Sequence, residues 1–150
     1  MEESFFENLY KHIPESNKAM LNEQFRMPAP IGSLVSQLFY KEKLKNGAIK
    51  NTQQFYDPKN IIRWINVERE HQLEKTSSYN KDQVQKIIEL LEQINRALNQ
   101  RKIRKTIGII TPYNAQKRRL RSEVEKCGFK NFDEIKIDTV DAFQGEEADI

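Results

Sequence analysis

The sequence predicts an α/β fold, a largely parallel sheet with helices on both faces. Three observations support this fold class. Short runs of β-branched residues alternate along the chain with longer stretches whose apolar residues recur at helical spacing. Pro, Asn and Gly stand where these stretches would begin or end. The length of 150 residues and the hydrophobic content of 37% suffice for one domain with its own core.

The first predicted helix lies over residues 31–39. Its apolar residues would form one face: Ile31, Leu34, Val35, Leu38 and Phe39. Pro28 and Pro30 fit the start of this helix, because the first helical turn needs no N–H donor from them. Residues 61–67 are rich in β-branched side chains and predict a strand. Between the two, the polar residues 45–60 are expected to be flexible.

A second, longer helix is predicted to begin after Asn80. Asn80 fits an N-cap, and Gln83 stands three residues later as the partner in a capping box. The apolar face of this helix consists of Val84, Ile87, Ile88, Leu91, Ile94 and Leu98. Residues 68–78, just before it, are expected to form a second flexible section.

The run at residues 107–110 predicts a strand, because it is too short and too rich in β-branched residues for a helix. Thr111 is expected to cap, and Pro112 to open, a helix over residues 112–127. Gly128 would close that helix, since glycine is favoured just after a helix C-terminus.

Residues 135–139 alternate between apolar and polar and predict another strand, and residues 148–150 predict the opening of one more. Ligands of such sheets bind beyond the carboxyl ends of the strands. Residues 111–113 fall there and offer a hydroxyl, helix N-terminal amides and an aromatic ring, which suits a phosphate with a sugar or base; the alternative is an ordinary helix start. Residues 139–147 fall there too and form either a binding turn or a solvated acidic loop.

Charge is unevenly distributed along the chain. The total of 25 Lys+Arg against 22 Asp+Glu gives a net charge of +3. Residues 96–121 contain nine basic residues and no acidic one. After Lys136, by contrast, every charged residue is acidic. Such a basic stretch indicates either a site for a polyanion or a solvated helix surface.

The composition excludes several classes of protein. With one cysteine, Cys127, the chain cannot form an internal disulfide, which is typical of a reducing compartment. One Cys and two His cannot supply the four ligands of a usual zinc site, and no metal ligands are predicted. The N-terminus lacks the features of a signal peptide, and no apolar run is long enough to span a membrane. We therefore expect an intracellular protein, cytoplasmic or, in a eukaryote, nuclear.

Three segments, in this order, resemble a known family. Residues 21–28 read LNEQFRMP, residues 109–116 read IITPYNAQ, and residues 139–150 read TVDAFQGEEADI. They are similar to the patterns Q-[YF]-R-M, I-T-P-Y-x-x-Q and T-V-D-x-F-Q-G-x-E-x-D in the second RecA-like domain of superfamily 1 helicases. The branch is the one that includes the nonsense-mediated-decay RNA helicases and the replication nuclease-helicases. The resemblance covers nearly the whole chain and implies a RecA-like, P-loop-NTPase-like sheet.

The chain also departs from that family. It has no G-x-x-x-x-G-K-[ST] P-loop and no Asp-Glu strand for magnesium. The family's final motif would lie beyond Ile150. Glu146 stands where the family often has a basic residue, and Phe25 where many members have Tyr. Residues 1–150 are therefore expected to be a C-terminal RecA-like helicase domain, truncated before the last motif and unable to hydrolyse ATP alone.

The resemblance implies that ATP binds between two RecA-like domains, with Mg²⁺ and most phosphate contacts supplied by the first. Arg26 would be the catalytic arginine finger, with a surface ion pair as the alternative. Phe25 would stack on adenine, or else pack in the core. Glu147 would bind the ribose, and Gly145 would let the nucleotide approach the backbone. Gln24 belongs to the same nucleotide set, although a structural hydrogen-bonding role suits it better.

The resemblance also implies a track for single-stranded nucleic acid, DNA or RNA. The expected track residues are Thr111, Pro112, Tyr113, Gln116 and Thr139. The full-length protein would be an ATP-dependent helicase or translocase of 5′-to-3′ polarity, with the first RecA-like domain as its other partner. The alternatives are a stand-alone nucleic-acid-binding module and a protein-interaction domain derived from a helicase. Arg26 and Glu147, useful only with ATP, weigh against both alternatives.

Overall fold

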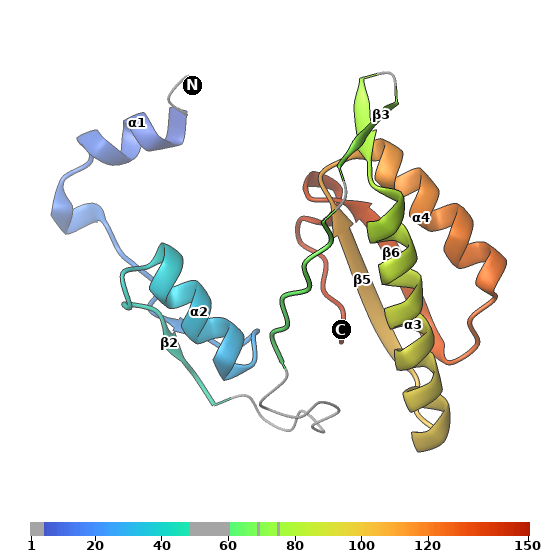
Figure 1. Ribbon diagram of the computed structural model, residues 1–150. Helices are drawn as coiled ribbons and strands as arrows, with labels where there is room; N and C mark the ends of the chain where they lie inside the picture. Colours follow the sequence, from blue (N-terminus) through green and yellow to red (C-terminus); the bar gives the residue numbers. More distant parts are fainter. Residues whose placement is uncertain (1–4, 49–60, 69, 75) are drawn as a thin grey trace. The chain divides into compact units, whose positions relative to one another are not determined.

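The computed structural model describes residues 5–48, 61–68, 70–74 and 76–150 (Figure 1). The chain divides into two compact units, Met1–Ile65 and Asn66–Ile150. The fold is mixed α/β with parallel strand pairs, as the sequence predicts.

The first unit is built around one helix and a short parallel strand pair. Its elements are α1 (Phe5–His12), η1 (Glu15–Asn17), β1 (Glu23–Gln24), α2 (Ala29–Phe39) and β2 (Lys45–Asn46). The predicted first helix is confirmed as α2, with Pro28 as its N-cap residue. The buried Ser36 hydroxyl donates to the Leu44 carbonyl at 2.7 Å and accepts from the Leu44 N–H at 3.1 Å. These bonds fix the chain where it enters β2.

Two predictions for this part of the chain need correction. Lys45 and Asn46 are not flexible but pair in parallel with β1, while residues 49–60 lie outside the described residues. Residues 61–67 form no strand, and Trp64 among them is 92% exposed. A β-branched run fits a pleated surface, but it becomes a strand only when a neighbour pairs with it. The boundary between the two units falls inside this run, after Ile65.

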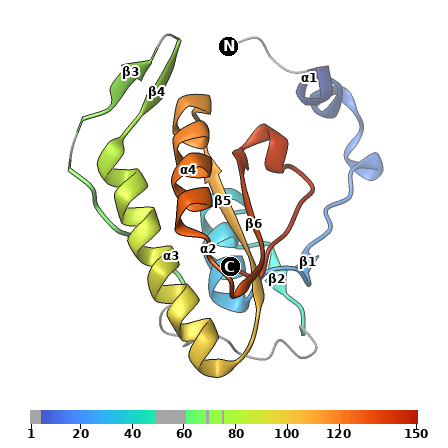
Figure 2. The ribbon, with the colours of Figure 1, turned by 90° about the vertical axis from the view of Figure 1, so that its right-hand side faces the viewer.

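The second unit contains a hairpin followed by a β-α-β arrangement. Its elements are β3 (Gln72–Glu74), β4 (Ser77–Tyr79), α3 (Lys81–Arg101), β5 (Lys105–Thr111), α4 (Asn114–Cys127), β6 (Phe132–Thr139) and η3 (Asp141–Phe143). β5 and β6 run parallel, with Ile107 opposite Ile135 and Thr111 opposite Thr139. α3 lies along α4, and α4 lies on both strands (Figures 1 and 2). The predicted strands are therefore confirmed, and both extend beyond the predicted residues.

The core of the second unit lies between its helices and strands. Its buried apolar residues are Val84, Ile88, Leu91, Leu98, Ile107, Ile109, Ala115, Leu120, Phe132 and Ile137. Four of the six residues on the predicted apolar face of α3 are among them; Ile87 and Ile94 are half-buried. Each buried Leu or Ile contributes about 1.5–3 kcal/mol relative to exposure. Gly128, at φ 57°, ends α4 as predicted.

The last residues of the chain lie beside β5. The Gly108 N–H donates to the Ile150 carbonyl at 2.8 Å, and the Ile150 N–H donates to the Thr106 carbonyl at 3.2 Å. This is parallel pairing on the β5 edge opposite β6, because N–H groups alternate between the two edges of a strand. The Asp149 carboxylate adds bonds from the Thr106 N–H at 2.9 Å and its hydroxyl at 3.0 Å. Residues 148–150 thus begin the strand pairing that the sequence predicts.

The hairpin replaces the second predicted flexible section. β3 and β4 pair antiparallel, with Gln72 opposite Tyr79. Glu74 of β3 forms ion pairs with Arg118 and Arg119 of α4, at 2.7 and 2.8 Å. The Arg119 guanidinium lies 3.6 Å from the centre of the Tyr79 ring. The prediction was wrong because the residues that stabilise the hairpin lie some forty positions away along the chain.

Candidate functional site

The turn over residues 25–27 is closed by the Gln24 side chain. Its Nε2 donates to the Met27 carbonyl at 2.8 Å and to Asn46 Oδ1 at 2.7 Å. Its Oε1 accepts from the backbone N–H groups of Arg26 at 2.9 Å and Met27 at 2.7 Å. All four hydrogen-bonding positions of the amide are therefore used within the protein. This favours the structural role of Gln24, whereas its contact with a ligand stays a prediction.

Phe25 and Arg26 are exposed on this turn. The Phe25 ring is 61% exposed, so it does not belong to the core of the first unit. One edge of the ring contacts Gly47, where a Cβ atom would overlap it. Glycine at position 47 therefore makes room for the ring, which keeps most of its surface available for a ligand.

The acidic loop after β6 begins with η3 and turns at Gly145. Gly145 has φ 84°, in the left-handed region that favours glycine. Glu147 is exposed two residues later. The Glu146 carboxylate lies 2.6 Å from Lys136 Nζ of β6, so this loop is not simply solvated. Gly145 and Glu147 lie in the second unit and Phe25 and Arg26 in the first.

The junction after β5 differs from its prediction by two residues. Thr111 is the last residue of β5 and is 6% exposed, and α4 begins only at Asn114, with Tyr113 as its N-cap residue. Thr111 stays in the strand because it pairs with Thr139 of β6. The Ala115 N–H, in the first turn of α4, donates to the Ser77 hydroxyl of β4 at 3.0 Å. One of the amides expected to bind phosphate is therefore already used.

Three track residues gather at the carboxyl edge of the sheet. Thr111 of β5 pairs with Thr139 of β6, and Tyr113 stands two residues after Thr111. The Tyr113 ring is partly exposed and meets the His71 ring edge-on at a centroid distance of 5.9 Å. Pro112 lies between Thr111 and the ring. Sequence reasoning missed His71, because it lies outside every motif and its approach to Tyr113 is a long-range contact.

Gln116, the remaining track residue, is 4% exposed. Its Oε1 accepts from the Asn80 N–H at 2.8 Å, and its Nε2 lies 3.5 Å from Gln83 Oε1. Asn80 Oδ1 accepts from the Gln83 N–H at 3.0 Å, which confirms the predicted cap. The second bond of the predicted capping box differs, since the Asn80 N–H goes to Gln116. Gln116 thus ties α3 to α4, and its contact with nucleic acid stays a prediction.

Most cations of the basic stretch have acidic partners. Lys117 and Arg121 both reach Asp138, at 3.0 Å each, and Arg118 and Arg119 share Glu74. Side-chain hydrogen bonds from these last two arginines lower the pKa of Glu74. The pKa of Asp138 is lowered mainly by a hydrogen bond from the Thr139 backbone N–H, and next by one from the Lys117 side chain. The face of α4 therefore attracts polyanions less than its sequence indicates.

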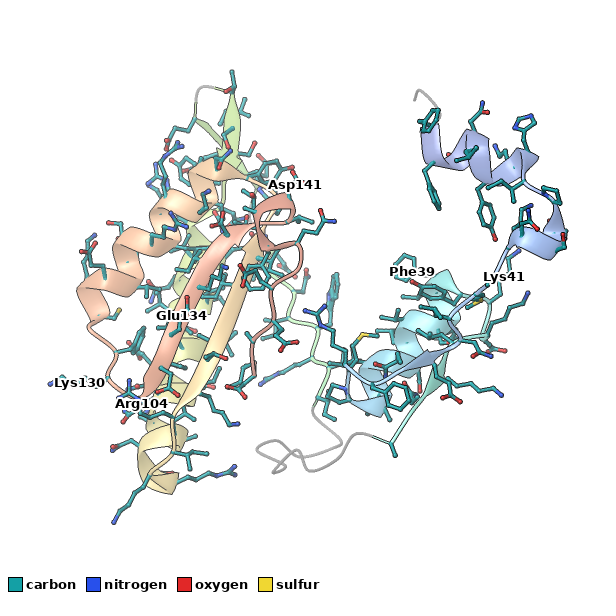
Figure 3. All side chains as sticks on the ribbon, turned by 180° about the vertical axis from the view of Figure 1, so that it is seen from behind. Phe39, Lys41, Arg104, Lys130, Glu134 and Asp141 are labelled. Carbon is teal, nitrogen blue, oxygen red and sulfur yellow. The ribbon has the colours of Figure 1, made fainter. Side chains whose placement is uncertain are left out.

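Arg104 and Lys130 lie at the amino ends of β5 and β6, away from the carboxyl ends (Figure 3). Figure 3 shows Arg104 and Lys130 at one end of the β5–β6 pair and Asp141 at the other. Arg104 forms an ion pair with Asp133 at 2.7 Å and donates to the carbonyls of Lys130 and Phe132. This arrangement clamps the amino end of β6. Arg104 and Lys130 thus lie away from the edge that carries Thr111 and Thr139.

Within the described ranges, no three His, Cys, Asp or Glu side chains gather as a metal site requires. None of the helices in the described part of the chain is long and apolar enough to cross a membrane.

A family model described as an AAA domain, AAA_12, matches residues 1–150. The chain belongs to this AAA domain family. Helicase sen1 of Schizosaccharomyces pombe is 30% identical over 155 residues, covering 99% of the chain and 9% of that protein. Helicase SEN1 of Saccharomyces cerevisiae is 32% identical over 146 residues, covering 90% of the chain and 6% of that protein. A human probable helicase with zinc finger domain is 27% identical over 151 residues, covering 96% of the chain and 8% of that protein.

These matches confirm the resemblance drawn from the three motifs. The chain is a superfamily 1 helicase domain of the AAA_12 family with a RecA-like α/β fold. It spans about a tenth or less of the length of these curated relatives.

Proposed function

We propose that this AAA domain is the second RecA-like motor domain of an ATP-dependent helicase or translocase that acts inside the cell. One observation carries the proposal. The Gln24 amide satisfies the turn over residues 25–27, on which the consecutive residues Phe25 and Arg26 are both exposed. A cation and an aromatic ring at consecutive exposed positions suit a nucleotide that is brought in by another domain. The helicase names of the relatives support the same class.

ATP, when bound, supplies the phosphoryl group on whose oxygens negative charge develops during transfer. Arg26 would stabilise this charge and would itself move no proton, because arginine stays protonated. Phe25 would offer a flat face to adenine, for which the tyrosine hydroxyl is not needed. Glu147 would accept a hydrogen bond from a ribose hydroxyl, and Gly145 would allow close approach. Mg²⁺ would be held by the first RecA-like domain.

The second ligand in this proposal is single-stranded nucleic acid, DNA or RNA, along the carboxyl edge of the β5–β6 pair. Tyr113 offers a partly exposed ring, and the neighbouring Thr111 and Thr139 mark the ends of the two strands. Such contacts to phosphate, sugar and base faces carry no sequence information. Binding would therefore be independent of base composition.

The proposal is tested by Arg26→Ala in the full-length helicase. We expect kcat for ATP to fall on the order of 10³-fold, because the guanidinium acts on charge that develops only in the transition state. The dissociation constant for ATP should change much less, and Arg26→Lys should rescue poorly because it lacks the planar fork. Arg96→Ala, an exposed arginine on α3, is the matched control and should keep normal turnover. Normal turnover in Arg26→Ala would contradict the arginine-finger role.

A further inference from the structure

The middle of β5 carries a glycine on which an aromatic ring rests. Ile107 and Ile109 point into the core, so Gly108 points to the opposite face of the sheet. A Cβ atom added to Gly108 would lie 2.6 Å from Cζ of Phe143, the last residue of η3. No side chain fits there unless the ring moves, because real Cβ contacts are longer. The Phe143 ring therefore packs directly against Gly108.

Lys136 holds the same ring from the neighbouring strand. It stands opposite Gly108 in the parallel register and therefore on the same face. Its Nζ atom lies 5.5 Å from the centre of the Phe143 ring and 2.6 Å from a Glu146 carboxylate oxygen. The ammonium group is thus within reach of a cation–π contact and an ion pair at once.

The backbone closes the same turn. The Glu146 N–H donates to the Phe143 carbonyl at 3.1 Å. The turn is therefore attached to the sheet at both of its ends, by the Phe143 ring and by the Glu146 carboxylate. Gly145 lies inside this turn, and Glu147 follows it directly. The path of both residues depends on how the turn is held.

We propose that Gly108 and Lys136 are positioning residues, which act through Phe143 and Glu146 to hold Gly145 and Glu147 in the orientation that binds the nucleotide. This inference rests on the proposed function, since it gives these two residues a role only if Glu147 contacts ATP. The competing explanation is a packed ring and an ordinary surface ion pair. It predicts a small change in stability and none in ATP binding.

The experiment is a double-mutant cycle in the full-length protein. Gly108→Ala should displace the ring and raise KM for ATP about tenfold, with a smaller change in kcat, because ground-state binding is affected most. Phe143→Ala should raise KM similarly. The double variant Gly108→Ala/Phe143→Ala should resemble Phe143→Ala alone, because the added methyl group overlaps mainly with the ring. If the two substitutions acted independently, their effects on KM would instead add in the double variant.

Lys136 provides a second test that does not depend on Gly108→Ala folding. Lys136→Ala should raise KM for ATP about threefold, and the exchanged pair Lys136→Glu/Glu146→Lys should recover most of this loss. Hydrogen exchange of residues 140–148 should be faster in Lys136→Ala. Glu134→Gln, two residues earlier on the same face of β6 (Figure 3), is the matched control and should change neither quantity.

Glu147→Gln separates the possible failures. If it raises KM while Gly108→Ala and Lys136→Ala leave KM and loop exchange unchanged, the positioning role is wrong and the nucleotide role of Glu147 stands. If Glu147→Gln leaves KM unchanged, the nucleotide role of Glu147 is wrong, and the positioning inference falls with it. A raised KM in all three variants, with faster loop exchange in Lys136→Ala, supports both.

Discussion

At the scale of single residues, the motif positions are of two kinds. Some side chains are exposed, and others form hydrogen bonds that fix the backbone around them. Phe25 is exposed on the turn, while Gln24 beside it uses its whole amide on the backbone and on Asn46. Gln116, in another motif, is likewise buried and bonded within the protein. The motifs of this chain therefore contain both exposed side chains and buried side chains that support the backbone. The sequence alone does not separate the two.

Gln24→Glu tests the supporting role. The carboxylate can still accept from the Arg26 and Met27 N–H groups, but it cannot donate to the Met27 carbonyl or to Asn46. We expect a loss of stability of about 1–3 kcal/mol in unfolding experiments. The turnover of the full-length protein should also fall about tenfold, because the backbone turn that carries Arg26 loses two of its hydrogen bonds. Gln85→Glu, at an exposed position on α3, is the control, and equal effects of both variants would contradict this role.

At the scale of elements, α4 is fixed from two sides by carboxylates. Glu74 of β3 binds Arg118 and Arg119, and Asp138 of β6 binds Lys117 and Arg121. Ser77 of β4 binds the first turn of α4. These contacts explain why residues 72–74 and 77–79 pair as strands, although their composition is typical of a loop.

These carboxylates make the stability of the second unit depend on acid pH. The usual pKa values are 4.5 for Glu74 and 3.8 for Asp138, and both are lowered in the folded protein. A group with a lowered folded pKa stabilises the fold above its unfolded pKa, and this contribution is lost as pH falls through the folded value. The Tm of the chain should therefore stay level down to about pH 5 and fall below about pH 4.

Glu74→Gln should reduce the acid-dependent part of this fall in Tm, measured by thermal unfolding over a pH series. Glu125→Gln, at an exposed position on α4, is the matched control. The interpretation is wrong if the two variants show the same pH profile.

At the scale of the whole molecule, the net charge of +3 overstates what the sheet edge offers to a polyanion. The cations of α4 are paired, and Arg104 and Lys130 lie at the other end of the strands. We expect weak binding of a labelled single-stranded oligonucleotide, with log K falling against log salt at a slope of roughly −1.5 to −2, since about two or three phosphates are contacted. Fluorescence anisotropy over a salt series measures it.

Tyr113→Ala should weaken this binding equally for every base composition, because the Tyr113 ring would contact the face of a base or a sugar, and every nucleotide offers both. Joint neutralisation of Arg101, Lys102, Arg104 and Lys105 should change binding little. If binding is lost in that variant and kept in Tyr113→Ala, then the track is misplaced and the basic segment before β5 binds instead.

The sequence by itself determined the α/β class, α2, α3 with its Asn80 cap, the β5–β6 strands and the Gly128 stop. The helices and their ends follow from periodicity and capping, which act over a few residues. The β5 and β6 segments are marked by short β-branched or alternating runs, although their pairing is a long-range contact. Only the tertiary structure decided that residues 61–67 form no strand, that residues 72–74 pair with residues 77–79 and that α4 begins at Asn114. It also decided that Gln116 is internal and that Phe143 sits on Gly108. Each depends on atoms far apart in the chain, because strand pairing and side-chain packing are long-range contacts.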